Sequence, residues 1–325
     1  MSVLVTGGAG FLGSHLVDAL LARGEHVIVM DDLSTGSIAN LEAAISSGAA
    51  TFVYADVATD SATLEALIER AAPRTPLSAI YHLASAASPD AYGARPWETL
   101  RVNGLGTMSL IDVALAHGAR FIYASTSEIY GDPLVHPQPE SYWGNVDPIG
   151  PRSCYDEGKR FGEAAIAAAV RVRDLDGRIV RFFNCYGPRM ERGDGRLIPA
   201  LLDAIAEERP LPIQGTGLQS RSLTYVDDAI ALLLHVGTLP RSAELRPVNI
   251  GADDERSVLD IARALAAVAG VECRLEHSAG REGDPQRRRP DMTRARALGW
   301  APRVSIEDGL RRTFRWFTDA RPAYV

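Results

Sequence analysis

Lysine is almost missing from this sequence: Lys159 is the only one, although Lys and Arg together number 34. Arginine therefore provides the remaining positive charges, so most positively charged positions accept arginine in place of lysine. The two side chains differ where a compact ammonium, or an amine with a movable pKa, is required. Codon bias can account for the scarcity of lysine but not for the place where one was kept. We therefore expect Lys159 to have a chemical role.

Cysteine is scarce as well, with Cys154, Cys185 and Cys273 as the three in the chain. An odd number without C-x-x-C spacing predicts free thiols rather than a disulfide framework or a zinc site. The seven histidines show no metal-ligand spacing, so no metal is expected. The first ten residues, MSVLVTGGAG, lack the basic and apolar regions of a signal peptide, which favours a cytoplasmic protein.

Long apolar runs and an excess of positive charge are absent too. No run is long enough for a membrane span, so no membrane partner is expected. The net charge of -7 argues against a nucleic acid, whose binding depends on phosphate neutralisation. An anionic small molecule is compatible with this charge, because a few arginines that gather locally can hold it.

Short apolar runs alternate with helix-length segments along the first half of the chain. Strands are predicted at 3–6, 26–30, 51–54, 79–83, 120–124 and 178–182, and helices at 11–22, 61–71, 96–116 and 154–173. This alternation indicates an α/β fold with a Rossmann-type, doubly wound parallel sheet. We expect residues 1–184 and about 222–250 to form that domain. Residues from about 185 to 221 and 251–325 are expected to form a smaller, mostly helical domain that ends in a helix at 306–318.

A glycine-rich loop follows the first predicted strand. Gly7, Gly10 and Gly13 allow a tight turn and a close approach of the backbone to a pyrophosphate, which then lies at the amino terminus of the next helix. Phe11 and Leu12 belong to the same loop. A turn without a ligand is the alternative, but Asp31 strengthens the nucleotide interpretation.

Asp31 ends the second predicted strand, where a carboxylate binds the ribose hydroxyls of NAD. It would repel the 2'-phosphate of NADP, and no arginine follows closely, so NAD is the predicted cofactor. Asp56 and Val57 follow the third strand and are predicted to contact the adenine side of the cofactor. An ordinary loop acid is the alternative for Asp56.

Tyr155 and Lys159 open the predicted helix at 154–173, and their i, i+4 spacing places both side chains on one face. A nearby ammonium favours the phenolate and should lower the pKa of Tyr155, which can then act as a base. Lys159 would also bind the nicotinamide ribose. A surface pair is the alternative, and the glycine loop makes it less favourable.

These motifs together resemble a known enzyme family. The glycine loop, HLAS at 82–85, STSEIYG at 125–131 and YDEGK at 155–159 resemble the extended short-chain dehydrogenase/reductases that modify nucleotide sugars. The longer strings YGDPLVHPQPESYWGNVDPIGPRSCYDEGKR, RFFNCYGPRM and DPQRRRPD are similar to UDP-glucuronate decarboxylases, the UDP-xylose synthases. The resemblance covers nearly the whole chain. It also implies a homodimer formed through helices near 96–116 and 154–173, and places Leu83 and Ala84 at the cofactor.

The segment after the fifth predicted strand is expected to contain further catalytic residues. The resemblance maps Thr126 onto the hydroxyl that bonds the reacting oxygen of the substrate, with Ser127 beside it. Glu128 maps onto the acid of the decarboxylases, where sugar dehydratases have an Asp-Glu pair. Ser125 and Glu128 also have the spacing of a helix capping box, which is the alternative.

The substrate of such an enzyme carries a pyrophosphate and a carboxylate, so arginines should gather around it. Arg221 and Arg288 match anion-binding positions of the family, and Arg288 is expected near the carboxylate because its guanidinium bonds two oxygens at once. A solvated basic loop is the alternative for 287–289. Further substrate candidates are Ser85, Asn184 and Arg196.

The resemblance and the chemistry of these groups predict NAD-dependent decarboxylation of UDP-glucuronic acid through a UDP-4-keto intermediate. UDP-xylose is the expected product, or UDP-4-keto-xylose where the intermediate escapes. The first alternative is a UDP-glucuronate 4-epimerase, which performs the same oxidation. A nucleotide-sugar 4,6-dehydratase and a non-enzymatic NAD-sensing module are less favoured.

Overall fold

The computed structural model describes residues 1–241, 245–280 and 285–319. A seven-stranded parallel sheet lies at its centre, with the strand order β11-β6-β5-β4-β1-β2-β3. Its strands are β1 (Ser2–Thr6), β2 (His26–Asp31), β3 (Ala50–Tyr54), β4 (Leu77–His82), β5 (Arg120–Thr126), β6 (Gly177–Phe182) and β11 (Val248–Ile250). The predicted doubly wound sheet is confirmed, and the order reverses beside β1, where ligands bind in such folds.

Side chains that alternate along each strand divide the core between the two faces of the sheet. Val3 and Val5 face one layer, which holds α1 (Phe11–Leu21), α2 (Glu42–Ser46) and α9 (Val226–Thr238). Leu4 faces the other layer, which holds α3 (Ser61–Ala71), α6 (Thr107–His117) and α7 (Ser153–Val172). Both faces are thus covered by helices, which explains why the strands carry apolar residues on both sides.

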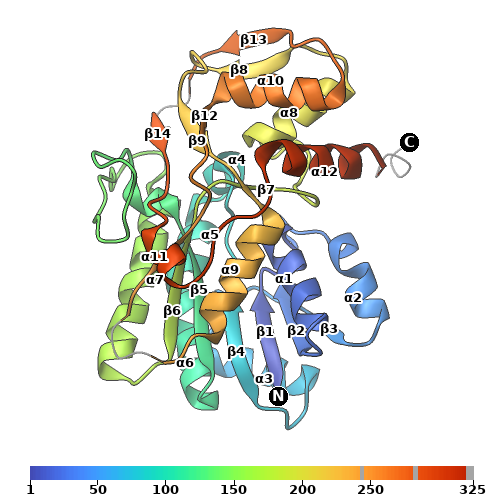
Figure 1. Cartoon of the computed structure of the whole chain (residues 1–325). Coiled ribbons are helices and arrows are strands. Elements are labelled where there is room, and N and C mark those ends of the chain that lie inside the picture. The colour runs from blue at the N-terminus through green and yellow to red at the C-terminus, as the bar shows by residue number, and fades with distance from the viewer. Residues whose placement is uncertain (242–244, 281–284, 320–325) are drawn as a thin grey trace.

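The remaining elements form a smaller unit beyond the carboxyl ends of the strands. It contains α8 (Leu197–Ala206), α10 (Val258–Ala269) and α12 (Ile306–Asp319), with β8 (Leu211–Gln214) paired to β13 (Leu275–Ser278). Figure 1 shows these elements above the sheet, on the side to which β1 points. β9 (Ser220–Ser222) lies between β12 (Glu255–Ser257) and β14 (Arg287–Arg288). Short connecting elements complete the fold: α4 (Pro89–Ala94), α11 (Thr293–Ala297), and β7 (Cys185–Tyr186) paired to β10 (Thr224–Tyr225).

The helix predicted at 96–116 differs from the observed one. The chain forms α5 (Pro96–Arg101), a π-helical turn at Val102–Gly106, and then α6. A Cβ on Gly106 would lie 3.1 Å from a Val57 methyl carbon, so the turn packs closely against the loop after β3. This turn also directs Asn103 toward Ser85, whose hydroxyl accepts a hydrogen bond from the Asn103 amide at 3.1 Å.

Within the described part of the chain, no helix combines the length and the apolar character that crossing a membrane requires.

Candidate active site

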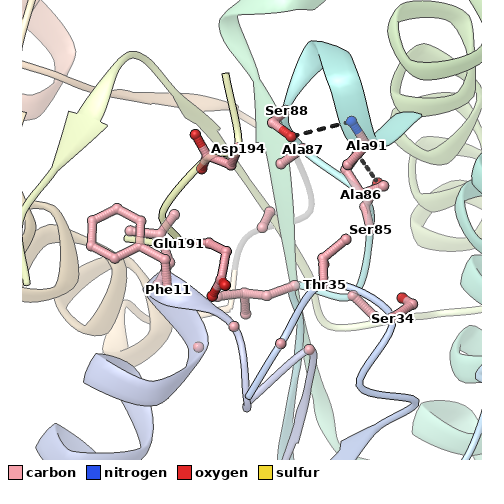
Figure 2. A pocket seen from close by; sticks show the side chains of 18 of the residues that line it. Phe11, Ser34, Thr35, Ser85, Ala86, Ala87, Ser88, Ala91, Glu191 and Asp194 are labelled. Atoms are coloured by element: carbon pink, nitrogen blue, oxygen red, sulfur yellow. Dashed lines mark hydrogen bonds between the residues drawn. The ribbon is translucent and has the colours of Figure 1, made fainter. Parts of the chain in front are cut away.

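A cleft of about 730 Å³ lies at the carboxyl ends of the strands, between the sheet and the smaller unit. Figure 2 shows the segment of Ser85, Ala86 and Ser88 on one side of this cleft and Glu191 and Asp194 on the other. The cleft is lined by every site residue predicted from the sequence except Arg221. Segments that are distant in the chain therefore meet at one sheet edge, where parallel α/β folds bind ligands.

The glycine loop after β1 forms a cradle that larger residues would fill. Gly7 has a φ of +71°, and a Cβ there would lie 2.6 Å from the backbone nitrogen of Ala84. A Cβ on Gly13 would lie 2.0 Å from the Gly7 carbonyl oxygen. Gly10 is the N-cap of α1 and supplies no side-chain cap, so the helix amino terminus is open to an anion.

Asp31 lies at the end of β2, next to this loop. Its carboxylate accepts hydrogen bonds from the backbone nitrogens of Ala9 at 2.9 Å and Leu33 at 2.8 Å. Burial nevertheless raises its pKa. Asp56 accepts a bond from the Ala58 nitrogen at 2.8 Å and lines the cleft with Val57. The cradle, the helix terminus and the buried carboxylate fit a dinucleotide.

Lys159 is a buried residue, only 2% exposed, on the second turn of α7. Its Nζ donates a hydrogen bond to the Ala124 carbonyl at 2.9 Å and lies 4.9 Å from the Tyr123 ring centroid. Burial lowers the pKa of Lys159 to about 7, although the charge of Glu163 opposes this effect. The alternative of a surface pair with Tyr155 is therefore wrong.

Tyr155 lies one turn earlier on α7, and its ring stacks on Tyr92 with 5.1 Å between centroids. Lys159 Nζ is 5.9 Å from the Tyr155 ring centroid, so the pair is close, as its spacing predicts. Burial raises the pKa of Tyr155, and a hydrogen bond with Thr126 opposes the rise. The prediction of a lowered pKa for Tyr155 is wrong for the protein without its cofactor, because burial and the charges of Glu128 and Asp156 raise this pKa.

Thr126 and Ser127 connect β5 to a 3₁₀ turn, η3 (Ser127–Tyr130). The Thr126 hydroxyl accepts a hydrogen bond from the Glu128 nitrogen at 3.2 Å, so Thr126 is the cap of this turn. Ser125 instead donates to Glu163 at 2.6 Å. The alternative of a Ser125–Glu128 capping box is therefore wrong.

Glu128 is buried between two guanidinium groups. Arg288 contacts both of its oxygens, at 2.7 Å and 2.9 Å, and Arg152 donates to the second oxygen. Burial alone would raise the pKa of Glu128, but the charges of Arg288 and Arg152 outweigh burial and lower it. Glu128 is therefore ionised at neutral pH, and three charged groups meet beside Thr126 and Tyr155.

Arg221 and Arg288 lie opposite each other in the paired strands β9 and β14. Arg288 is buried and lines the cleft, whereas the side chain of Arg287 is 60% exposed. The alternative of a solvated loop is thus wrong for Arg288. Arg221 does not line the cleft, and it donates to the Ser220 carbonyl, but its charge also acts on Glu128.

The other substrate candidates lie farther along the cleft. The Asn184 side-chain oxygen is buried and accepts no hydrogen bond from the residues that the structure describes. Arg196 forms an ion pair with Asp194 at 2.5 Å and lies over the Phe11 ring. Ser85 donates to the Ala86 carbonyl at 3.3 Å (Figure 2). These groups offer a donor and acceptors to a polar ligand.

Over residues 1–241, 245–280 and 285–319, no three His, Cys, Asp or Glu side chains gather as a metal site.

Comparison with known proteins identifies the family. Residues 3–251 match the NAD dependent epimerase/dehydratase family. The chain belongs to this family.

Within this family, the chain is similar to UDP-glucuronic acid decarboxylase 1 of Xenopus tropicalis. The two are 40% identical over 316 residues, which is 97% of this chain and 72% of the relative. Among solved structures, a dTDP-glucose 4,6-dehydratase of Streptomyces venezuelae with bound NAD has a TM-score of 0.87 and 31% identity, covering 99% of this chain and 98% of that chain. A UDP-glucuronic acid 4-epimerase of Bacillus cereus in complex with UDP-glucuronic acid and NAD has a TM-score of 0.85 and 27% identity, covering 98% of this chain and 99% of that chain. The cofactor of the present chain is NAD, as predicted.

The structure of this family member adds site residues that sequence reasoning missed. Arg152 bonds Glu128, Tyr92 stacks on Tyr155, and Asp156 is buried beside Arg152. Arg152 and Asp156 have the i, i+4 spacing of an ion pair, which was the available signal. No sequence pattern links Arg152 to Glu128, because the chain between them must first fold back.

Proposed function

We propose that this chain is an NAD-dependent UDP-glucuronate decarboxylase that forms UDP-xylose. The observation that carries the proposal is the contact of Glu128 with Arg288 and Arg152, beside Thr126 and Tyr155. A carboxylate and two arginines at the reacting end suit a substrate that carries its own carboxylate. The identity of 40% with a curated decarboxylase supports the same reaction.

The cofactor is held by residues of the sheet edge. Gly7, Gly10 and Gly13 would leave room for its pyrophosphate, and Asp31, which lines the same cleft, would bind the ribose. NAD supplies the hydride acceptor and donor, and its oxidised ring brings a positive charge that favours the phenolate form of Tyr155.

Tyr155 removes the proton from the sugar 4-hydroxyl while carbon 4 is oxidised to a ketone. Thr126 donates a hydrogen bond to the same oxygen. Arg288 holds the carboxylate on carbon 5, which is then β to the new carbonyl. Tyr155, Thr126 and Arg288 all line the same cleft, which supports a base at carbon 4 and a cation at the leaving group.

The bond between carbon 5 and the carboxylate breaks, and its electrons form an enolate as carbon dioxide leaves. Tyr155 and Thr126 stabilise that enolate by hydrogen bonds to its oxygen. A water molecule oriented by the Glu128 carboxylate supplies the proton that carbon 5 then receives, and reduction of the ketone completes a redox-neutral reaction.

The 4-epimerase is the second candidate, because a solved UDP-glucuronic acid 4-epimerase shares this fold. A 4-epimerase performs the same oxidation, but it must retain the carboxylate and let the keto-sugar rotate within the site. The 4,6-dehydratase is less favoured, because Glu128 is not preceded by Asp: residue 127 is Ser.

The deciding experiment is incubation with UDP-glucuronate labelled at the carboxyl carbon, in the presence of NAD. We expect labelled carbon dioxide and UDP-xylose. The Tyr155→Phe variant should lose about 10²- to 10⁴-fold in rate, since it lacks the base. Formation of UDP-galacturonate without carbon dioxide would establish the epimerase instead, and full activity of Tyr155→Phe would support a non-enzymatic NAD sensor.

A homodimer is part of the proposal. Large apolar side chains are exposed on α5, on the π-helical turn, on α6 and on α7, and these elements pack against one another. They are Trp97, Leu100, Leu105, Met108 and Phe161. An apolar surface of this kind is typical of a contact between subunits.

A further inference from the structure

Asp156 is a buried carboxyl group that the proposed reaction does not use. It follows Tyr155 in the first turn of α7, and its side chain is 8% exposed. Oδ1 accepts no hydrogen bond from any residue within the described ranges. The side chain does not line the cleft, so it acts on the substrate through a neighbour.

That neighbour is Arg152, which two carboxylates share. Its Nη2 donates to Glu128, while its Nε lies 3.8 Å from Asp156 Oδ2. The charges of Glu128, Arg152, Arg288 and Glu157 all act on Asp156. Asp156 in turn acts on the uncharged groups packed around it, which are Tyr92, Cys154 and Tyr155. Arg221 completes the cluster through its charge on Glu128.

A simple charge count shows what a ligand does to this cluster. Glu128, Asp156, Arg152 and Arg288 carry no net charge when both carboxyl groups are ionised, and the charges of Glu157 and Arg221, which act on the same two carboxyl groups, cancel each other. A substrate carboxylate at Arg288 adds one negative charge. Since buried charges are costly unless compensated, the added charge favours the protonated form of a carboxyl group in the cluster.

We propose that Asp156 is a positioning residue that takes up one proton from solvent when the carboxylate of the substrate binds at Arg288. This inference rests on the proposed function, since UDP-glucuronate brings that carboxylate. The proton neutralises Asp156, so that Arg152 compensates Glu128 alone and keeps it in place beside Thr126. No covalent bond to carbon changes in this step.

The two carboxyl groups differ in the way that this role requires. Burial and the charge of Glu128 raise the pKa of Asp156 to about 7, although Arg152 and Arg288 oppose the rise. The pKa of Glu128 is lowered instead. Near neutral pH, Asp156 is therefore the group that can change its charge, while Glu128 remains ionised.

The test is calorimetric titration of the Tyr155→Phe holoenzyme, which binds substrate without turnover. Titrations at about pH 7.5 in phosphate and in Tris, whose ionisation enthalpies differ, give the number of protons taken up. We expect an uptake on the order of half a proton for UDP-glucuronate. UDP-glucose, which has a hydroxymethyl group in place of the carboxylate, should bind without proton uptake.

Two further variants assign the proton to its residue. Asp156→Asn, added to Tyr155→Phe, should abolish the uptake, because the amide does not titrate. Glu157→Gln is the matched control, since it removes a carboxylate from the same helical turn but one that is 38% exposed and paired with Arg160. Proton uptake should persist in this variant, because Asp156 still titrates, although the lost charge of Glu157 lowers the pKa of Asp156 somewhat.

Steady-state kinetics give an independent measurement that does not depend on the variant's stability. In the unmodified enzyme, KM for UDP-glucuronate should rise with pH above about 7, by up to tenfold per unit. Binding of UDP-glucuronate without proton uptake, equal uptake with UDP-glucose, or uptake that persists in Asp156→Asn would each overturn the proposal. Failure of UDP-glucuronate to bind would contradict the proposed function instead.

Discussion

At the scale of single residues, Lys159 shows how a functional group lowers stability. The only lysine of the chain is buried against Ala124 and Tyr123, where its charged form has lost water. The folded protein therefore holds this amine at a pKa of about 7, well below the value of 10.5 for an ordinary lysine. Such a group costs free energy of folding whenever the unfolded chain would carry the proton.

The first prediction concerns the pH dependence of this cost. It is fully present below about pH 7 and declines as the pH rises toward 10.5, by about 1.4 kcal/mol per unit. Urea unfolding of Lys159→Met, which has no titrating amine, should therefore show its greatest advantage over the parent at pH 7 or below. The difference should shrink steadily by pH 9.5, and the variant should be inactive.

Arg171→Met, on the exposed end of the same helix, is the control for this series. Its free energy of unfolding should differ from that of the parent by the same amount at every pH. A difference for Lys159→Met that is equally flat would show that the amine is not buried as described.

Residue-scale chemistry was predictable where the pattern is local. Tyr155 and Lys159 are one turn apart on a helix, so their proximity follows from helix geometry. Their pKa values do not follow, because burial depends on Tyr92, Tyr123 and the sheet, which are distant in sequence. The contact of Arg152 with Glu128 was equally unpredictable, since it depends on how residues 131–150 return to η3.

At the scale of elements, the segment 131–150 fixes the strand that carries Arg288. Gln138 is fully buried, and its side-chain oxygen accepts a hydrogen bond from the Arg289 nitrogen at 2.9 Å. Its own backbone nitrogen donates to the Arg289 carbonyl, and its carbonyl accepts from Asp291, both at 2.9 Å. The segment 131–150 thus holds β14 in register beside β9, with Arg288 facing Glu128.

The second prediction follows from that arrangement. Gln138→Ala removes a buried hydrogen bond and leaves the Arg289 nitrogen unpaired, so stability should fall by roughly 1–3 kcal/mol. KM for UDP-glucuronate should rise more than kcat falls, because Arg288 is displaced while Tyr155 is not. Gln286→Ala changes an exposed side chain of the same segment and should alter neither value. An unchanged KM in Gln138→Ala would show that the segment 131–150 does not position Arg288 for substrate binding.

Elements themselves were predicted well where their signals lie within the element. The helix predicted at 61–71 has the observed bounds of α3, and Asp60 caps it through a bond from Thr63. The range predicted as a helix at 96–116 is helical throughout, but the sequence did not predict the π-helical turn at Val102–Gly106, which packs against Val57. Because Val57 and Gly106 are 49 positions apart, their contact produces no periodic pattern in the sequence.

At the scale of the whole molecule, association and activity can be separated. The apolar residues on α5, α6 and α7 lie outside the cleft, and Phe161 is 46% exposed. The third prediction is that Phe161→Glu prevents the proposed homodimer from forming, because a charge would be buried at the contact. Light scattering coupled to gel filtration measures the mass. Val172→Glu, an exposed position at the end of α7, should leave the dimer intact, and a monomeric parent would refute the proposed assembly.

The single lysine makes the protein selective toward chemical labelling. Apart from the terminal amine, an aldehyde or activated ester meets one primary amine in the chain, and that amine lines the cleft. Because burial lowers the pKa of this amine to about 7, it is more nucleophilic near neutral pH than an ordinary lysine. A reagent small enough to enter the cleft would add one label there, apart from any at the terminal amine, and mass spectrometry would show whether a bound dinucleotide shields Lys159.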